Sequence, residues 1–331
     1  MFFTAKIIKI SIDFRRWLKA KCTIRQLKKQ KFLTFTSNKK VMQQLKLSKL
    51  IAGTMNWGVW GKNLSTADMA HRISFCAENG ISSFDHADIY GGYTTEASFG
   101  KAFAATKIDR DKVQFVSKCG IQSIAENRPT VVKHYDYSKP HIIKSVENSL
   151  QNLQTDYLDV LLLHRPSPLL NPDEVADAIF TLIRDGKILE FGLSNFSPTQ
   201  TELLRQKINI EYNQFQFSAS DVEPMTNGNL DYMMLHHIRP MAWNPLGNVL
   251  NGKTEKSLRI KNTIAILAKK YEVSNDVFLL AWIMKHPASV LPVFGTTNMD
   301  RMKNLLKTMD LKIDLEDWFL VWEANLGRKV D

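Results

Sequence analysis

The sequence has few cysteines and no long apolar run, and both absences exclude classes of protein. Its apolar stretches fall short of the roughly 20 residues that a membrane-spanning helix needs, so we expect no membrane association. The three cysteines, Cys22, Cys76 and Cys119, form an odd, sparse set without CxxC spacing. Such a set fits a reducing compartment and offers no disulfide framework. We therefore predict a cytoplasmic protein.

Two binding motifs are also missing. No GxGxxG follows an apolar stretch, which argues against a Rossmann-type dinucleotide site. The pair His236 and His237 has no partner ligands at metal-binding spacing. We interpret the pair as part of a solvated helix face and predict no metal site.

An excess of basic charge is confined to residues 1–41. This segment holds twelve Lys or Arg and one acid, Asp13; removing these from the totals of 44 bases and 33 acids leaves 32 of each in 42–331. A basic, acid-poor segment could be a targeting peptide, or a tail that touches anionic lipid or nucleic acid. We favour a third interpretation, an extension upstream of a natural start at Met42, because no turn residues tie it to the neutral domain. We therefore predict a domain over 42–331 that binds no nucleic acid.

Short apolar runs alternate with longer amphipathic segments along this domain. With 331 residues, 44% of them hydrophobic, the chain can fill one large core. The alternation predicts eight strands separated by helices, which indicates a parallel α/β fold. The number eight favours a closed (β/α)8 TIM barrel over an open doubly wound sheet. The expected strands are 50–55, 81–84, 113–117, 157–163, 188–194, 210–215, 239–243 and 290–294.

Local signals place several other segments. Ser197-Pro198 predicts a helix start, with Pro at a favoured first-turn position. Residues 121–139 follow the third strand, and we expect them to form a long loop that shapes a binding pocket. Residues 314–323 are expected to form an extra C-terminal helix with Asp314 as its cap.

Polar side chains stand at the predicted strand ends, where the active sites of such barrels lie. Asp85 follows the second strand and Tyr90 comes five positions later, while Lys118 and His164 follow the third and fourth strands. A tyrosine has a pKa of about 10, and a neighbouring ammonium would lower the pKa of Tyr90 and make it a better proton donor. Asp85 could hold Lys118, and His164 could orient a carbonyl oxygen. Each residue alone is more often a packing residue or a rim charge, but together they predict a catalytic group.

These stretches resemble those of the aldo-keto reductases over about residues 45–330 and, within that family, the bacterial YdhF-like oxidoreductases. The resemblance implies a barrel enzyme that reduces an aldehyde or ketone to an alcohol, with NADPH as its cofactor and NADH less expected. It implies a catalytic tetrad of Asp85, Tyr90, Lys118 and His164, in which Tyr90 donates the proton. The matching stretches are FDHADIYGGY (84–93), VSKCGI (116–121), LLLHRP (161–166), FGLSNF (191–196), YNQ (212–214), MAWNPLG (241–247) and PVFGTTNMDR (292–301).

The resemblance also implies where the cofactor binds. Ser194, Asn195 and Gln214 would hold the nicotinamide carboxamide, and Trp243 would stack on the ring. This fits the chemistry, because an amide needs donors and acceptors and an indole offers a flat apolar face. At the other end of the cofactor, a phosphate would gain from the guanidinium of Arg301 near a helix start. The predicted cofactor-binding residues are Thr54, Ser194, Asn195, Gln214, Trp243, Asn244, Leu246, Gly295, Thr296, Thr297, Arg301 and Asn304.

Two positions depart from the pattern of many family members. The stretch Gly295-Thr296-Thr297 stands where a Lys commonly lies near the 2′-phosphate. Leu305 stands where an Asn commonly follows the Arg, and Asn304 comes one residue early. Both departures bear on the choice between NADPH and NADH.

Aromatic residues are expected to line the substrate pocket, and they favour an apolar or aromatic aldehyde or ketone. The expected lining residues are Trp57, Trp60, Tyr93 and Tyr135, with Tyr137 as a further candidate. Trp318 and Trp322 could close the pocket from the C-terminal helix, although amphipathic spacing also explains them as packing. Cys119, next to Lys118, could have a lowered pKa, but packing is its expected role.

Other functions on the same fold stay open, since fold alone does not decide activity. One is a non-catalytic nicotinamide-binding regulatory subunit, although such a module has no need of Tyr90 near Lys118. Another is a sugar-phosphate enzyme, although MAWNPLG (241–247) is not a convincing phosphate loop. We therefore predict an enzyme that acts on a small-molecule carbonyl substrate as a monomer or weak homo-oligomer.

Overall fold

The computed structural model describes residues 47–126 and 128–331, which contain a barrel of eight parallel strands. The strands are β1 (Ile51–Gly53), β2 (Ser83–Asp85), β3 (Gln114–Cys119), β6 (Leu158–Leu163), β7 (Ile188–Ser194), β8 (Tyr212–Gln216), β9 (Arg239–Trp243) and β10 (Leu291–Phe294). Strand β1 pairs in parallel with both β2 and β10, so the barrel is closed. This closure confirms the predicted (β/α)8 barrel and excludes the open sheet. The segment 1–41 and the predicted start at Met42 lie outside the described residues.

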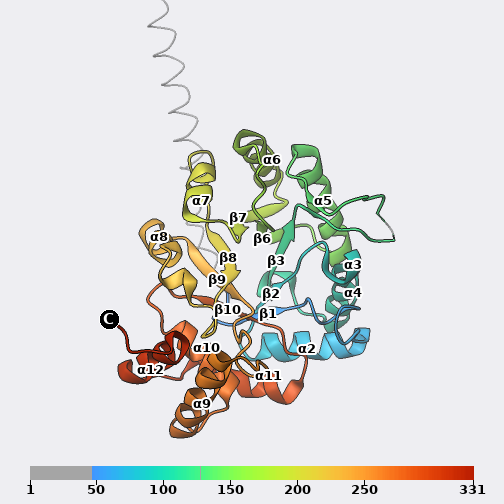
Figure 1. Ribbon diagram of the computed structural model, residues 1–331. Helices are drawn as coiled ribbons and strands as arrows, with labels where there is room; N and C mark the ends of the chain where they lie inside the picture. The colour runs from blue at the N-terminus through green and yellow to red at the C-terminus, as the bar shows by residue number, and fades with distance from the viewer. Residues whose placement is uncertain (1–46, 127) are drawn as a thin grey trace, which may run out of the picture. The chain divides into compact units, whose positions relative to one another are not determined.

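Helices surround the barrel, as Figure 1 shows. They are α2 (Thr66–Glu78), α3 (Tyr90–Tyr93), α4 (Thr95–Thr106), α5 (Lys139–Leu153), α6 (Pro172–Arg184), α7 (Pro198–Arg205), α8 (Asn229–His236), α9 (Glu255–Lys270), α10 (Asn275–Met284), α11 (Met299–Leu305) and α12 (Leu315–Leu326). Short 3-10 turns are η1 (Arg110–Lys112), η2 (Glu223–Met225) and η3 (Leu306–Met309). Ser197 and Gln200 form a reciprocal capping box at the start of α7, as the Ser-Pro signal predicts. None of the helices over 47–126 and 128–331 is long and apolar enough to cross a membrane.

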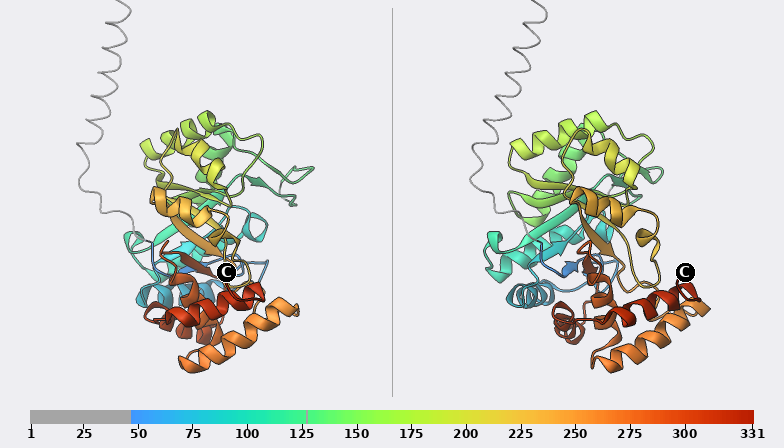
Figure 2. Two further views of the ribbon diagram at one scale, coloured as in Figure 1. Left: turned by 60° about the vertical axis from the view of Figure 1, so that its left-hand side comes forward. Right: turned by 90° about the vertical axis from the view of Figure 1, so that its left-hand side faces the viewer.

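The segment 121–139 is more ordered than a plain loop. Strands β4 (Ile121–Gln122) and β5 (His134–Tyr135) pair in an antiparallel two-stranded sheet, and this part of the chain stands out from the barrel in Figure 2. The prediction of a long loop did not include this short hairpin, because two-residue strands leave too little alternation to detect in the sequence. The hairpin places the side chain of Tyr135 at the main cavity.

The C-terminal helix α12 begins after Asp314, as predicted, although the Asp314 side chain makes no capping bond. It lies against α9, which the two views of Figure 2 show side by side. The indole of Trp318 stacks on Trp282 at a centroid distance of 4.9 Å, and each indole N–H donates to the other residue's carbonyl oxygen. Neither Trp318 nor Trp322 lines the main cavity, so their role is packing.

Candidate active site

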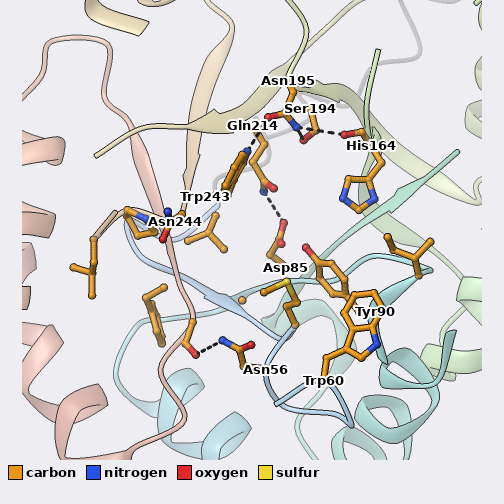
Figure 3. A pocket seen from close by; sticks show the side chains of 18 of the residues that line it. Asn56, Trp60, Asp85, Tyr90, His164, Ser194, Asn195, Gln214, Trp243 and Asn244 are labelled. Atoms are coloured by element: carbon orange, nitrogen blue, oxygen red, sulfur yellow. Dashed lines mark hydrogen bonds between the residues drawn. The ribbon is translucent and has the colours of Figure 1, made fainter. Parts of the chain in front are cut away.

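The carboxyl ends of the barrel strands surround a cavity of about 680 Å³. In a parallel barrel these ends meet at one face, so residues far apart in sequence come together there. Most of the predicted site residues line this cavity: Trp60, Asp85, Tyr90, Tyr135, His164, Ser194, Asn195, Gln214, Trp243, Asn244, Leu246, Gly295, Thr296 and Arg301. Figure 3 labels ten of the lining residues.

A buried lysine connects the predicted catalytic residues. Lys118, at 1% exposure, donates from Nζ to Asp85 Oδ1 at 2.6 Å and to the Tyr90 hydroxyl at 3.2 Å. Its third N–H donates to the His86 carbonyl oxygen at 2.7 Å. All three ammonium hydrogens are therefore used, which holds the lysine in one position under Tyr90.

Asp85 is satisfied on both oxygens. Its Oδ2 accepts from Gln214 Nε2 at 2.7 Å, while Oδ1 takes the lysine. Gln214 comes from β8, on the far side of the barrel from β2, and is 129 residues later in the chain. Gln214, which was predicted to bind the cofactor, therefore also holds the Asp85 carboxylate in place. Asp85 in turn holds Lys118.

Two glycines set the position of Tyr90. Gly91 and Gly92 follow it with φ angles of 60° and 63°, in the left-handed region that favours glycine. A Cβ on Gly91 would lie 2.4 Å from Thr95 Oγ1, so a larger residue would displace this turn. The turn ends the loop after β2 and directs the phenol into the cavity (Figure 3).

The surroundings raise the pKa of Tyr90 rather than lower it. Burial is the largest cause, and it outweighs the opposing effect of the Lys118 ammonium. The expectation of a lowered pKa is therefore wrong, because desolvation of a phenolate outweighs one nearby positive charge. Lys118 itself has a raised pKa: burial opposes its charge, but Asp85 and Tyr90 together favour it. The pair is thus an ammonium beside a neutral hydroxyl.

His164 faces the same part of the cavity as Tyr90 (Figure 3). The two rings are 6.1 Å apart between centroids and nearly perpendicular, at 79°. Burial and the Lys118 charge hold the pKa of His164 well below its usual range, so the imidazole is neutral. Its Nδ1 is buried and has no hydrogen-bond partner among the described residues.

The predicted amide ligands are bonded to one another. Asn195, at the end of β7 with φ of 65°, donates from Nδ2 to Ser194 Oγ at 2.8 Å. Its Oδ1 accepts from Trp243 Nε1 at 2.9 Å, which fixes the indole at the cavity wall. Asparagine tolerates left-handed backbone better than most residues, and here that conformation turns its side chain toward the β9 end.

At the far end of the cavity, Arg301 lies beside Gly295 and Thr296. Its Nε forms an ion pair with Asp276 Oδ2 at 3.0 Å, which ties α11 to α10. The Gly295 carbonyl oxygen accepts from Asn56 Nδ2 at 3.4 Å. This end of the cavity therefore offers the Arg301 guanidinium beside the exposed main chain of Gly295.

Three predicted cofactor residues do not line the cavity. Thr54 Oγ1 donates to the Asp85 carbonyl oxygen and contacts His86 Nδ1, so its side chain points behind β2. The Thr297 carbonyl oxygen accepts from Arg72 on α2. Asn304 donates to Ser274, on the outer side of α11. The side chains of Thr54 and Asn304 therefore have structural partners, and Thr297 is held through its main chain.

Two predicted pocket aromatics are also placed elsewhere. Trp57 is 1% exposed and packs against Phe84 and Phe99 in the core, because the loop after β1 folds inward at this residue. Tyr93 lies behind the wall, where its hydroxyl accepts from the Ser123 main-chain N–H at 2.9 Å. The prediction that both line the pocket does not hold. Trp60 and Tyr135 do line it.

Other predicted side chains turn out to pack. The thiol of Cys119 is buried, and burial raises its pKa well above the usual range, so packing is confirmed over reactivity. Tyr137 is buried too, with its hydroxyl donating to the Arg165 carbonyl oxygen at 2.5 Å.

Thirteen further residues line the cavity, and four of those that the sequence analysis missed have polar or charged side chains. Two are cations, Lys133 on the hairpin loop and Arg165 directly after His164, and two are polar, Asn56 and Ser123. The Arg165 guanidinium lies 5.4 Å from the centroid of the Trp243 ring. Arg165 lies within the LLLHRP stretch, so this motif could have predicted it as a site residue. No sequence signal predicted Lys133, because only the hairpin brings it to the cavity.

Known proteins are similar to the chain over most of its length. The 6-dehydroglucose reductase of Agrobacterium fabrum is 36% identical over 87% of this chain and 100% of its own. The oxidoreductase YdhF of Escherichia coli is 36% identical over 83% of this chain and 93% of its own. The aldo-keto reductase of Klebsiella pneumoniae in complex with NADPH shares the fold, with a TM-score of 0.68 at 22% identity over 82% and 89% of the two chains.

A model of the aldo/keto reductase family matches residues 49–325, which is nearly all of the barrel and α12. This match and the two bacterial relatives agree with the predicted resemblance. The proteins of this family are oxidoreductases that use a nicotinamide cofactor. The chain belongs to the aldo/keto reductase family.

Proposed function

We propose that this protein reduces the carbonyl group of an aldehyde or ketone to an alcohol, with NADPH as cofactor and Tyr90 as proton donor. One observation carries the proposal: the buried Lys118 ammonium contacts both Asp85 and the Tyr90 hydroxyl at a cavity. Burying an unpaired charge costs roughly several kcal/mol of folding free energy. A lysine kept there beside a phenol is typical of a site that stabilises a phenolate.

In this mechanism the side chains of the protein hold one proton and transfer it to the carbonyl oxygen. A nicotinamide cofactor supplies a hydride when bound. As negative charge develops on the carbonyl oxygen, Tyr90 donates its hydroxyl proton, and Lys118 at 3.2 Å stabilises the phenolate that forms. Asp85 keeps the ammonium in place. The raised pKa of Tyr90 keeps the donor protonated at neutral pH.

His164 would orient the carbonyl. A neutral imidazole carries one N–H, which can donate to the carbonyl oxygen without competing for the Tyr90 proton. Its pKa, held well below the usual range, keeps it neutral across the physiological range. The Tyr90 and His164 groups would then approach one oxygen from two directions.

The donor set fits a nicotinamide carboxamide. The Ser194 hydroxyl accepts from Asn195 and keeps its own hydrogen to donate, and Gln214 keeps Oε1 as an acceptor after donating to Asp85. One donor and one acceptor satisfy a carboxamide. Trp243, held by Asn195, offers the flat face for the ring.

Arg301 supports NADPH over NADH. Its guanidinium lies at the far end of the cavity, and a phosphate is well suited to its planar set of donors. The Klebsiella pneumoniae relative of the same fold is a complex with NADPH. We therefore assign the 2′-phosphate to Arg301.

The pocket mouth suggests a substrate with an aromatic body and an acidic group. Trp60 and Tyr135 offer ring faces, and Lys133 and Arg165 offer positive charge. The sole acid among the lining residues is Asp85, whose two oxygens already have partners. A carboxylate on the substrate would therefore meet cations without a competing acid. The Agrobacterium fabrum relative is named for 6-dehydroglucose, so this aldehyde belongs among the compounds tested.

The test is consumption of NADPH and of NADH with benzaldehyde, 4-carboxybenzaldehyde and 6-dehydroglucose. We expect Tyr90→Phe to lower turnover by about 10²–10⁴-fold while NADPH binding is kept. Tyr93→Phe is the matched control, because that hydroxyl bonds main chain behind the wall, and it should keep wild-type turnover. Unchanged turnover in Tyr90→Phe would refute the mechanism. NADPH binding with no compound reduced would favour the non-catalytic regulatory subunit.

A further inference from the structure

A second cavity, of about 550 Å³, lies at the end of the barrel opposite the active site. Residues at the starts of β9 and β10 line it, together with the end of α10 and the stretch from η3 to Ile313. Strand β10 runs between the two cavities, since Leu291 lines this one and Gly295 lines the active site. Its size lies in the range of about 300–1,000 Å³ typical of small-molecule sites.

The wall of this cavity is aliphatic. No aromatic side chain is among its lining residues, whereas Trp60, Tyr90, Tyr135 and Trp243 line the active site. Nucleobases and other flat rings are usually held against aromatic faces, so an aliphatic wall fits an alkyl chain better. The apolar lining residues are Leu47, Ala281, Met284, Val290, Leu291, Met309, Leu311 and Ile313.

The rim of the cavity is basic. Four cations line it, Lys49, Arg239, Lys285 and Lys312, and no acid does. Asp310, between two lining residues, is exposed and outside the lining. Within 47–126 and 128–331, none of the four cations has an ion-pair partner. Four unpaired cations around one opening attract an anion.

We propose that this cavity binds an alkyl carboxylate, with its chain against the aliphatic wall and its carboxylate among the rim cations. Charge opposes the chain's own N-terminal segment as the occupant, because residues 1–41 carry twelve bases and one acid. The site is separate from the proposed reductase chemistry, since Tyr90 and Lys118 are at the other end of the strands.

The experiment is calorimetric titration of the full chain with sodium dodecanoate, below the concentration at which it forms micelles. We expect saturable one-to-one binding. Dodecyltrimethylammonium has the same tail with a cationic head and should not bind, and inorganic phosphate has an anionic head without a tail and should bind far more weakly. Equal binding of either probe, or no binding of dodecanoate, would overturn the proposal.

Charge reversal locates the binding. The double variant Lys285→Glu, Lys312→Glu changes two exposed rim residues, so the fold should persist, and we expect dodecanoate to bind at least about tenfold more weakly. The control is Lys261→Glu, an equally exposed lysine on α9 outside the cavity, which should bind as the wild type does. Wild-type affinity in the double variant would place dodecanoate elsewhere and refute the site.

Discussion

Two ion pairs lie at opposite ends of strand β3, and they differ in what surrounds them. At the carboxyl end, Lys118 Nζ lies 2.6 Å from Asp85 Oδ1 at the active-site cavity. Before the strand begins, Arg110 Nη2 lies 2.6 Å from Asp159 Oδ2. The distances are equal, so distance does not distinguish the proposed catalytic pair from a structural one.

The environment of Arg110 is closed. Its guanidinium donates to Thr155 Oγ1 and to the carbonyl oxygens of Val113 and Tyr157. It also lies 4.1 Å from the ring centroids of Phe115 and Tyr157. All contacts of the Arg110 guanidinium are with other protein groups. Lys118, in contrast, donates to the Tyr90 hydroxyl, which faces the active-site cavity. In these two pairs, the charge at the amino end of β3 serves stability, and the charge at its carboxyl end serves the proposed chemistry.

The largest expected effect is on the active-site pair. Lys118→Met should lower kcat/KM for carbonyl reduction by about 10³-fold or more, because the phenolate of Tyr90 loses its ammonium. The same change leaves the buried Asp85 carboxylate without its cation, so the free energy of unfolding should also fall by about 3–5 kcal/mol. Steady-state kinetics and a thermal melt measure both. A collapse of the fold with turnover kept in the folded fraction would reverse the comparison.

Breaking the opposite pair should lower stability to a similar extent and leave turnover unchanged. Arg110→Met leaves Asp159 buried and unpaired, so we expect the free energy of unfolding to fall by about 3–5 kcal/mol, with kcat unchanged where the protein is folded. Urea unfolding and kinetics at low temperature measure this. The control, Arg184→Met, breaks an exposed pair with Asp185 and should leave stability unchanged. A loss of kcat in Arg110→Met without loss of stability would contradict the structural role.

A third buried acid sharpens the comparison because it has no cation beside it. Asp88 accepts from Ser145 Oγ on one oxygen, and its other oxygen has no partner. Burial first, and then Glu96, raise the pKa of Asp88 to about 7. A raised folded-state pKa means that stability is highest below the unfolded value near 4 and is lost as pH rises through about 7.

Asp88→Asn should remove this loss of stability at higher pH, because the amide stays neutral and can still accept from Ser145. Between pH 5 and pH 8 the wild type should lose about 2 kcal/mol more unfolding free energy than the variant. Urea unfolding at pH 5, 6.5 and 8 gives both curves. Parallel curves would show that Asp88 has the same charge in the folded and unfolded states.

The smallest expected effect concerns the charges at the cavity mouth. Arg165→Met should raise KM for 4-carboxybenzaldehyde by about tenfold and leave KM for benzaldehyde unchanged, because only the first substrate carries a carboxylate. The neutral aldehyde also controls for the contact between Arg165 and Trp243. An equal rise for both aldehydes would assign Arg165 to holding the indole instead.

Much of the barrel and of the catalytic group was predictable from local patterns. Apolar runs spaced by amphipathic segments predicted the strands, and the polar residues after them, such as Asp85 and His164, predicted the site. Positions in loops were less predictable. Trp57 and Trp60 belong to one loop, yet the first packs in the core and the second lines the cavity. Residue type does not specify the direction of a side chain where no period constrains it.

The sequence by itself determined eight strands, their polar ends and the chemistry available there. Only the tertiary structure decided which of these groups meet. Barrel closure brings Gln214 to Asp85. At the other end of the barrel, the starts of β9 and β10 assemble a basic cavity from residues as distant as Lys49 and Lys312. It also decided the direction of the Tyr90 pKa shift, because burial is a property of the whole fold and here exceeds the effect of one adjacent charge.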